Sequence, residues 1–306
     1  MLARQSTERR KRTTTLLIGV AVVVLIVLGL IFALGVRVFD FPFATNRNIN
    51  EYCATLGLPN DDSRSTPESI FADADIEEPA EGITLGKRLT ADGITSRYNI
   101  YARNIDFSKP VGVVVRLHGD GGEEFYKPDE LAACLAEVAA SHNKILVVPL
   151  SPDSDGERTW WEDIPSSTTF LGALLDDVAK KHKFNRHDVH WTGYSGGAEV
   201  LSYGLIPQFP SLIGNGALML GGGGASRHME TVATEKQKQT IKLTWATGMN
   251  DDGTDPNSTF DAKSAAEKGA RWYRDEGFAN VSLNLIRDAD HFSLPEQALL
   301  DEFLTK

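Results

Sequence analysis

The stretch Trp191-Thr192-Gly193-Tyr194-Ser195-Gly196-Gly197 decides the fold, because it places a serine on a tight turn between two regular elements. Residues 187–192 predict a short buried strand, and residues 198–205 predict a helix. Gly193 and Gly197 flank Ser195 at the G-x-S-x-G spacing, where a side chain at either glycine would clash with the turn. The helix that follows directs its free N–H groups and positive dipole end at the same point. The stretch therefore predicts an exposed nucleophile at Ser195, the alternative being a chance Gly/Ser turn.

Strands and helices alternate on both sides of this turn. The predicted strands are residues 94–102, 111–117, 145–149, 187–192, 216–220, 241–247 and 281–286, and the predicted helices are 128–140, 170–181, 198–205, 264–277 and 294–304. The near-continuous apolar run at 111–117 suits a central strand that is covered on both faces. This alternation predicts an α/β fold with a doubly wound, mostly parallel sheet.

Polar segments follow four of these strands at their carboxyl ends. They are His118–Gly122, Ser195, Asn250–Asp252 and Asp288–His291. Sheets of this class bind ligands outside the carboxyl ends of their strands. We therefore expect the four segments to meet in one site.

A serine hydroxyl needs a general base, and the seven histidines of the chain are the candidates. Five have simpler explanations: His142 and His182 end predicted helices, His187 and His190 lie at the wrong end of a strand, and His228 is in a polar loop. His118 precedes a glycine loop and is better placed to order it than to act as the base. His291 lies in a loop after the last strand, where it satisfies the chain order Ser, Asp, His, and is the predicted base.

The third member of such a triad is a carboxylate that orients the imidazole. Asp251 follows the strand at 241–247 and is the first choice, and its neighbour Asp252 is the alternative. Asp288 and Asp290 share the loop of His291 and are more simply explained as solvated loop residues.

The loop His118-Gly119-Asp120-Gly121-Gly122 brings backbone N–H groups close to the serine. We expect the N–H groups of Asp120 and Gly196 to form the oxyanion hole. A phosphate-binding loop is less favoured, because the segment lacks G-x-G-x-x-G and the Lys-Ser/Thr pair of a P-loop. Trp160, Trp161 and Tyr194 are candidates for the substrate pocket, although one or both tryptophans could instead belong to the core. No cofactor or metal motif is recognised.

From about Ile94 to the C-terminus, these motifs resemble the α/β-hydrolase superfamily, and within it the esterases related to polyhydroxybutyrate depolymerases, feruloyl esterases and acetylxylan esterases. The resemblance rests on the strand followed by His118-Gly-Asp-Gly-Gly, on Gly193-Tyr-Ser195-Gly-Gly, on Gly248-Met-Asn-Asp251 and on the late His291. It implies Ser195 as nucleophile, Asp251 as acid, His291 as base and an acyl-enzyme intermediate. The doubled Asp251-Asp252 departs from the usual pattern.

The N-terminus carries a separate signal. Leu16 to Val36 is an uncharged stretch of 21 residues, long enough to cross a bilayer as a helix, and it follows the basic cluster Arg9–Arg12. Residues 1–15 are therefore predicted to be a cytoplasmic tail, 16–36 an uncleaved single-pass transmembrane signal anchor, 37–86 a juxtamembrane stalk and 87–306 an extracytoplasmic hydrolase domain. A cleaved signal peptide is the competing interpretation.

The net charge bears on the ligands that the chain could bind, and the cysteines bear on its disulfide bonding. The net charge is −11 although five of the first twelve residues are Lys or Arg, so the remainder is strongly acidic and nucleic acid is an unlikely ligand. The two cysteines, Cys53 and Cys134, either form a disulfide, as an external location would permit, or leave Cys134 as a buried thiol.

These observations predict a membrane-anchored, extracytoplasmic serine hydrolase, with a carboxylesterase favoured. Only about 20 residues separate Leu220 from the next predicted strand, too few for a large lid, so we expect an open site suited to bulky or polymer-attached esters. A catalytically silent binding module of the cell envelope is the alternative from another class, and peptidase or acyltransferase activity is a third possibility.

Overall fold

The computed structural model describes residues 36–39, 76–153, 157–227 and 230–305. The chain divides into two compact units, Met1–Arg37 and Val38–Lys306. Strand β1 (Val36–Phe39) crosses this boundary, and the architecture below belongs to the second unit.

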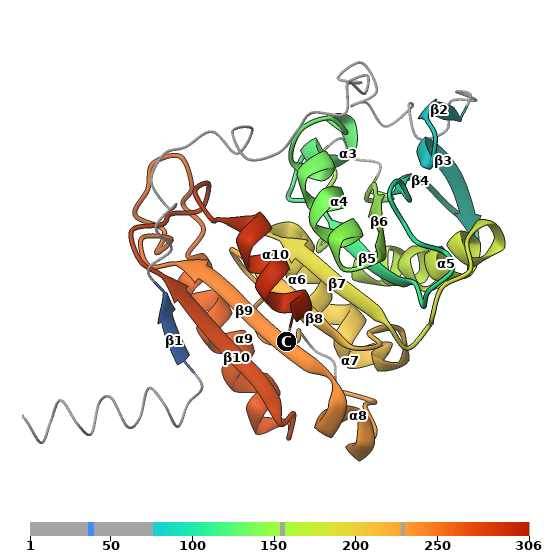
Figure 1. The fold of residues 1–306 in the computed structure, drawn as a ribbon. Helices are drawn as coiled ribbons and strands as arrows, with labels where there is room; N and C mark the ends of the chain where they lie inside the picture. Colours follow the sequence, from blue (N-terminus) through green and yellow to red (C-terminus); the bar gives the residue numbers. More distant parts are fainter. Residues whose placement is uncertain (1–35, 40–75, 154–156, 228–229, 306) are drawn as a thin grey trace, which may run out of the picture. The chain divides into compact units, whose positions relative to one another are not determined.

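A twisted sheet forms the centre of this unit (Figure 1). Its strands are β2 (Glu77–Ala80), β3 (Ile83–Ala91), β4 (Ile94–Tyr101), β5 (Gly112–Leu117), β6 (Lys144–Pro149), β7 (Val189–Tyr194), β8 (Gly216–Leu220), β9 (Lys242–Gly248) and β10 (Asn280–Ile286). From β10 they are ordered β10-β9-β8-β7-β5-β6-β4-β3-β2. The strands from β10 to β6 pair in parallel, whereas β2, β3 and β4 pair in antiparallel fashion and join the sheet at β6.

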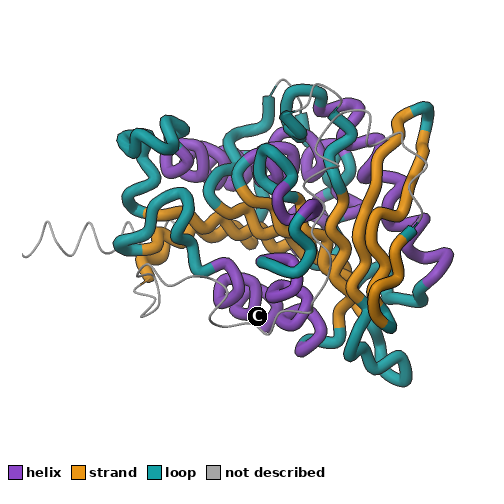
Figure 2. The backbone as a smooth tube through the Cα atoms, turned by 90° about the horizontal axis from the view of Figure 1, so that it is seen from above, coloured by secondary structure: helices purple, strands orange, loops and turns teal. Residues whose placement is uncertain are grey.

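Helices cover both faces of the sheet (Figures 1 and 2). Their bounds are α3 (Glu123–Tyr126), α4 (Leu131–Ser141), α5 (Ile164–Lys181), α6 (Gly196–Val200), α7 (Ile206–Gln208), α8 (Glu235–Thr240), α9 (Ala262–Asp275) and α10 (Glu296–Thr305). Between α6 and α7 the helix continues as a π-helical turn, η3 (Leu201–Leu205). Helices α4 and α10 pack together on one face, and α5, α6 and α9 lie on the other.

Each face buries its own apolar layer. On the α4 and α10 face the core includes Val114, Leu146, Leu218, Leu135 and Phe303. On the opposite face the apolar stripe of α5, which is Leu171, Leu174, Leu175 and Val178, is buried. Strands β5 and β6 are buried at every position, as expected for strands covered on both sides.

The strand order reverses at β5, because β6 follows β5 in the chain on one side whereas β7 lies against its other side. Crevices at the carboxyl ends of strands form at such a switch point. The loop that begins at His118 follows β5 and Ser195 follows β7, so the topology brings the two motifs to the same crevice.

The predicted α/β fold with a doubly wound, mostly parallel sheet is confirmed. The predicted strands and helices are present with shifted ends; α5, for example, begins at Ile164 because Asp163 accepts a hydrogen bond from the Ser166 N–H and caps the helix. Sequence analysis missed β2, β3, α3 and α8. Strand β2 and the start of β3 lie within residues 77–86, so this part of the predicted stalk belongs to the sheet.

Residues 16–35 of the predicted transmembrane anchor lie outside the described residues, and Val36 begins β1. Within the described residues, no helix combines the length and apolarity needed to cross a bilayer. Cys134 is buried in α4 and is disulfide-bonded, whereas Cys53 lies outside the described residues.

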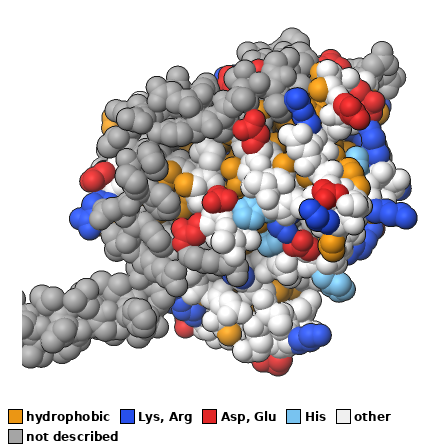
Figure 3. All heavy atoms as spheres, viewed as in Figure 1, with side chains coloured by type: hydrophobic (Ala, Val, Ile, Leu, Met, Phe, Trp, Pro, Cys, Tyr) orange, Lys and Arg blue, Asp and Glu red, His pale blue; other side chains and the backbone are white. Residues whose placement is uncertain are grey.

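Acidic and basic side chains are interspersed on the face shown in Figure 3.

Candidate active site

The turn that carries Ser195 is strained. Ser195 has φ 49° and ψ −115°, a backbone conformation that residues other than glycine rarely adopt. A Cβ atom at Gly193 would lie 2.3 Å from the carbonyl oxygen of Gly197, and one at Gly197 would lie 2.4 Å from that of Leu117. Only glycine fits at both positions, and the serine is held between β7 and α6 with its side chain partly exposed.

Ser195, His291 and Asp251 form a continuous hydrogen-bonded chain. The Oγ atom of Ser195 lies 3.1 Å from Nε2 of His291, and Nδ1 of His291 lies 2.9 Å and 3.1 Å from the two carboxylate oxygens of Asp251. The His291 and Asp251 side chains are 8% and 1% exposed. The hydroxyl of Thr247 donates to Asp251 at 3.3 Å. A serine, a histidine and a carboxylate in this order can pass a proton from the hydroxyl to the imidazole.

The neighbouring aspartates are not part of this chain. Asp252 is exposed and accepts hydrogen bonds from the hydroxyl and the N–H of Thr254, which lower the pKa of its carboxyl. Asp290 accepts from the Phe292 N–H and the Ser293 hydroxyl and closes the turn around His291. Of the two carboxylates left open by the sequence, the structure places Asp251 against the imidazole.

His118 orders the glycine loop, as the sequence analysis expected. It is fully buried; its Nε2 accepts from the Ser151 N–H at 2.9 Å, and its Nδ1 donates to the Gly119 carbonyl at 2.6 Å. Burial lowers the pKa of His118 to about 4, so the ring is neutral at pH 7. A neutral ring fixed at both nitrogens is not available as a base.

The residues predicted to supply the oxyanion donors, Asp120 and Gly196, line the same pocket as Ser195. Gly196 begins α6, where an N–H has no partner within the helix, and the N–H of Asp120 likewise has no protein acceptor among the described residues. The Asp120 side chain leans over Gly196, where a Cβ would lie 2.0 Å from its Oδ1 atom. Trp161 Nε1 donates to the Asp120 carboxylate at 3.1 Å. Burial raises the pKa of Asp120, and the surrounding acidic residues add to the increase.

A pocket of about 460 Å³ opens beside the serine. It is lined by Gly119, Asp120, Trp161, Tyr194, Ser195, Gly196, Glu199, Tyr203, Arg227, Ser258, Thr259, Phe260, His291 and Phe292. Trp161 and Tyr194 thus occupy the predicted positions. Trp160 does not: it is fully buried, with its ring 4.9 Å from that of His118, and it belongs to the core. Trp161 instead donates to the Asp120 carboxylate at the pocket, and this contact separates the roles of the two tryptophans.

Sequence analysis missed several lining residues. Phe260 and Phe292 form aromatic walls and are 37% and 59% exposed, and their ring centroids lie 6.1 Å and 5.2 Å from that of His291. Glu199, Tyr203 and Arg227 were also missed. Glu199 follows Ser195 by one helical turn, and this spacing was the available signal for it. Arg227 lies in an irregular loop, and no sequence pattern indicated its place in the pocket.

A buried charge cluster underlies the site. Arg116 in β5 has no exposed surface and pairs with Glu124 at 2.8 Å and Glu296 at 2.6 Å. Burial opposes its charge, but the two glutamates outweigh that effect and raise the pKa of Arg116. The guanidinium also lies 5.7 Å from the ring centroid of Tyr194, whose hydroxyl donates to the His291 carbonyl at 2.9 Å. A charge within an otherwise apolar predicted strand was the sequence signal for this cluster.

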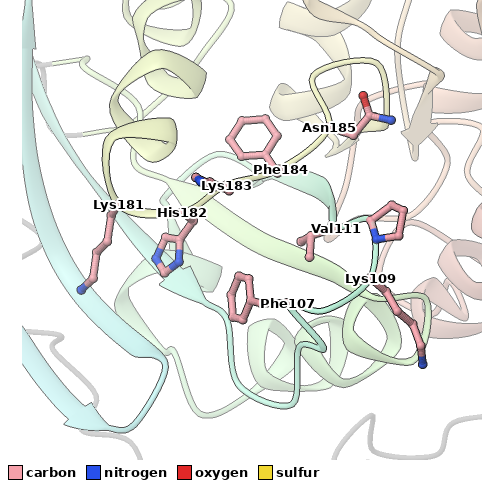
Figure 4. Close-up of a pocket in the computed structure, with 9 residues that line it drawn as sticks. Phe107, Lys109, Val111, Lys181, His182, Lys183, Phe184 and Asn185 are labelled. Atoms are coloured by element: carbon pink, nitrogen blue, oxygen red, sulfur yellow. The ribbon is translucent and has the colours of Figure 1, made fainter.

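A second pocket, of about 570 Å³, lies at the opposite ends of the strands, next to the residues that precede β5 and β7 (Figure 4). The rings of Phe107 and His182 stack there at 6.2 Å. Lys109 and Lys181 pair with Asp106 and Glu78. The described residues that line it include no serine, cysteine or carboxylate. Within the described residues, no group of three or more His, Cys, Asp or Glu side chains could hold a metal ion.

No family model and no curated protein sequence matches the chain. Solved structures do resemble it. A thermostable esterase aligns with a TM-score of 0.52 at 16% identity, over 72% of this chain and 62% of that chain. The Bacillus cereus carboxylesterase aligns with a TM-score of 0.51 at 22% identity, over 68% and 93% of the two chains. The feruloyl esterase module of Clostridium thermocellum gives 0.52 at 12% identity, over 82% and 93%. These likenesses establish the α/β-hydrolase fold that the motifs resembled.

Proposed function

We propose that this protein is a serine hydrolase, and specifically a carboxylesterase that acts through an acyl-enzyme. The observation that carries the proposal is the unbroken chain from Ser195 Oγ through His291 to Asp251, with contacts of 3.1 Å and 2.9 Å. The hydrogen bonds among Ser195, His291 and Asp251 are those that the nucleophile, base and acid roles require, which supports the proposal. The esterases that share the fold support the reaction class.

The reaction follows from this arrangement. His291 Nε2 takes the hydroxyl proton as Ser195 Oγ attacks the ester carbonyl carbon, and Asp251 stabilises the imidazolium. The carbonyl oxygen becomes an oxyanion between the N–H groups of Asp120 and Gly196. Collapse breaks the bond to the alcohol oxygen, which leaves with the proton from His291. Water then attacks the acyl-enzyme with His291 again as base, which releases the acid and restores the Ser195 hydroxyl.

An open pocket supports bulky or polymer-attached esters as substrates. The segment between β8 and β9 contains only the short helix α8 and no lid domain among its described residues. Ser195 is partly exposed, and Phe260 and Phe292 stand at the rim. A catalytically silent module would have no need of a buried carboxylate aligned on an imidazole, because burying a charge is costly unless it is paired. Peptidase or acyltransferase activity would use the same acyl-enzyme.

We also propose that the protein is a single-pass membrane protein with an extracytoplasmic catalytic domain. Support comes from the uncharged stretch Leu16–Val36 after the basic cluster Arg9–Arg12. The disulfide at Cys134 adds to it, because disulfides persist in oxidising compartments. Protease digestion of intact cells or spheroplasts that express the full chain tests this topology. The proposal fails if the catalytic domain is cleaved only after lysis.

Labelling with a fluorophosphonate probe tests the enzyme proposal. Wild type should label, whereas Ser195→Ala and His291→Ala should not. Ser258→Ala is the matched control, since Ser258 lines the same pocket but has no hydrogen bond to His291, and it should label like wild type. Hydrolysis of a panel from short acyl to feruloyl and hydroxybutyrate esters then defines the substrate range. A folded wild type that neither labels nor cleaves any ester would favour the binding-module alternative.

A further inference from the structure

We infer that the pocket beside Ser195 takes an ester that also carries a carboxylate, and that Arg227 binds this carboxylate. The inference rests on the proposed function, because it names the substrate class of the same site. Its basis is the position of Arg227, the partners of its guanidinium and the placement of the acidic groups around the serine.

Arg227 lines the same pocket as Ser195 and His291. Its guanidinium lies 4.3 Å from the ring centroid of Tyr203 and 6.0 Å from that of Trp161. Its Nη2 atom donates to the Tyr203 hydroxyl at 3.3 Å. Aromatic faces hold a guanidinium by cation–π attraction while its N–H groups at the edge stay available. Arg227 is thus oriented by neutral groups.

No carboxylate among the described residues forms an ion pair with Arg227, although an acid is near. Glu199 is 5% exposed, and its oxygens accept from the Gly223 N–H at 3.1 Å and the Gly224 N–H at 3.5 Å. Burial raises the pKa of Glu199, and its hydrogen bonds with Tyr203, Gly223 and Gly224 and the charge of Arg227 oppose this increase. Of the five N–H donors of Arg227, the contact with Tyr203 uses one. Within the described part of the chain, Arg227 is therefore a pocket cation without a direct counter-ion.

The other groups of the pocket favour one orientation for an anionic substrate. Asp120 leans over Gly196 and pairs only with the neutral indole of Trp161 among the described residues, so it repels an anion on its side of the serine. Phe260 and Phe292 offer apolar surface. A substrate with an apolar linker between the ester and the carboxylate fits these groups: its carboxylate lies at Arg227 and away from Asp120, and its linker contacts the phenylalanines. The guanidinium fork matches a carboxylate with two parallel hydrogen bonds.

The test compares two ligands of similar length that differ in charge. They are the 4-nitrophenyl monoester of glutaric acid, which is anionic at pH 7, and 4-nitrophenyl valerate, which is neutral. Binding is measured to the Ser195→Ala protein by calorimetry, so that the answer does not depend on turnover. Hydrolysis by the active protein is measured in parallel. Succinate and adipate monoesters vary the linker length.

We expect the anionic ligand to bind about tenfold or more tightly than the neutral one, the scale of a charge-assisted contact that is partly exposed. Arg227→Gln in the Ser195→Ala background should remove this ratio, and Arg227→Lys should keep part of it. Arg271→Gln is the matched control, because Arg271 is an exposed arginine on α9 that does not line the pocket and its loss changes the net charge equally. This variant should keep the full ratio.

Equal binding of the two ligands to the Ser195→Ala protein would overturn the inference, as would an anion preference that survives Arg227→Gln. An equal loss of the ratio in Arg271→Gln would also overturn it, since the effect would then come from net charge alone. Failure of the proposed function has a different signature, which is a folded wild type that does not label with fluorophosphonate or cleave either ester.

Discussion

Replacing Asp251 by asparagine should remove most of the activity while leaving the fold in place. The amide has the size of the carboxylate but no charge. It therefore cannot stabilise the imidazolium that forms on His291 as Ser195 attacks. Asp251 lies 2.9 Å from Nδ1 of His291 and is only 1% exposed, so water cannot replace it.

The magnitude follows from Coulomb's law. Two unit charges about 4 Å apart at an effective dielectric constant of about 20 attract by about 4 kcal/mol. That energy corresponds to roughly a 10³-fold loss in kcat. Asp252→Asn is the matched control: Asp252 is exposed and contacts Thr254 rather than His291, so its loss should change kcat less than about twofold.

The assay measures kcat for a 4-nitrophenyl ester and the rate of fluorophosphonate inactivation for both variants, with circular dichroism to verify folding. The two rates should fall together in Asp251→Asn, since both need an activated Ser195. The reasoning would be refuted if Asp251→Asn kept more than about a tenth of wild-type activity. It would also be refuted if Asp252→Asn were the more damaged variant.

Three further predictions concern stability. Gly193→Ala should fail to fold or lose all activity, because its Cβ would lie 2.3 Å from a backbone oxygen, whereas Gly172→Ala in α5, where a Cβ meets nothing closer than 4.0 Å, should be neutral or stabilising in thermal unfolding. Arg116→Met should lower the unfolding free energy in urea by about 3–5 kcal/mol, because it leaves two buried glutamates without their partner; a loss under about 1 kcal/mol would contradict this. Burial lowers the pKa of His118 and His190 to about 4, so the unfolded chain binds more protons between about pH 6.5 and pH 4. Stability is therefore fully present above pH 6.5 and is lost as the pH falls through this window, and His190→Gln should reduce the slope by up to about one proton; an unchanged slope would contradict the assignment.

Local sequence patterns predicted the turn at Ser195 well, because its geometry is set within a few residues. Gly193 and Gly197 are required by clashes with their own neighbourhood, and the apolar runs of β5 to β10 fix the parallel sheet. The same topology brought Ser195 and His291 together from segments far apart in sequence. The sequence alone was sufficient to predict that these residues meet in one site, because each polar segment follows the carboxyl end of a strand.

The choice between Asp251 and Asp252 could not be made from sequence. It depends on how the segment after β9 turns, and that turn is set by a contact between distant residues. A Cβ at Gly248 would lie 2.2 Å from the Ala289 carbonyl oxygen, so β9 and the His291 loop touch at this glycine. The Asn250 N–H donates to the same carbonyl at 3.0 Å. Trp160 and Trp161 present the same difficulty, because tertiary contacts distinguish them: Trp160 packs against His118 in the core, whereas Trp161 contacts Asp120 at the pocket.

The distance between the nucleophile and the base depends on contacts that no single segment of sequence reveals. Ser195 follows β7, and His291 lies in the loop before α10, five positions before Glu296. Arg116 in β5 pairs with Glu296 and so ties the start of α10 to the strand next to β7. Tyr194, one residue before the serine, donates to the His291 carbonyl. Two independent contacts thus hold the His291 loop against the nucleophile turn, namely the Arg116–Glu296 ion pair and the hydrogen bond from the Tyr194 hydroxyl. A loop fixed at both points can keep a 3.1 Å contact between Ser195 and His291 without a lid above it, which is what an open site for large esters requires.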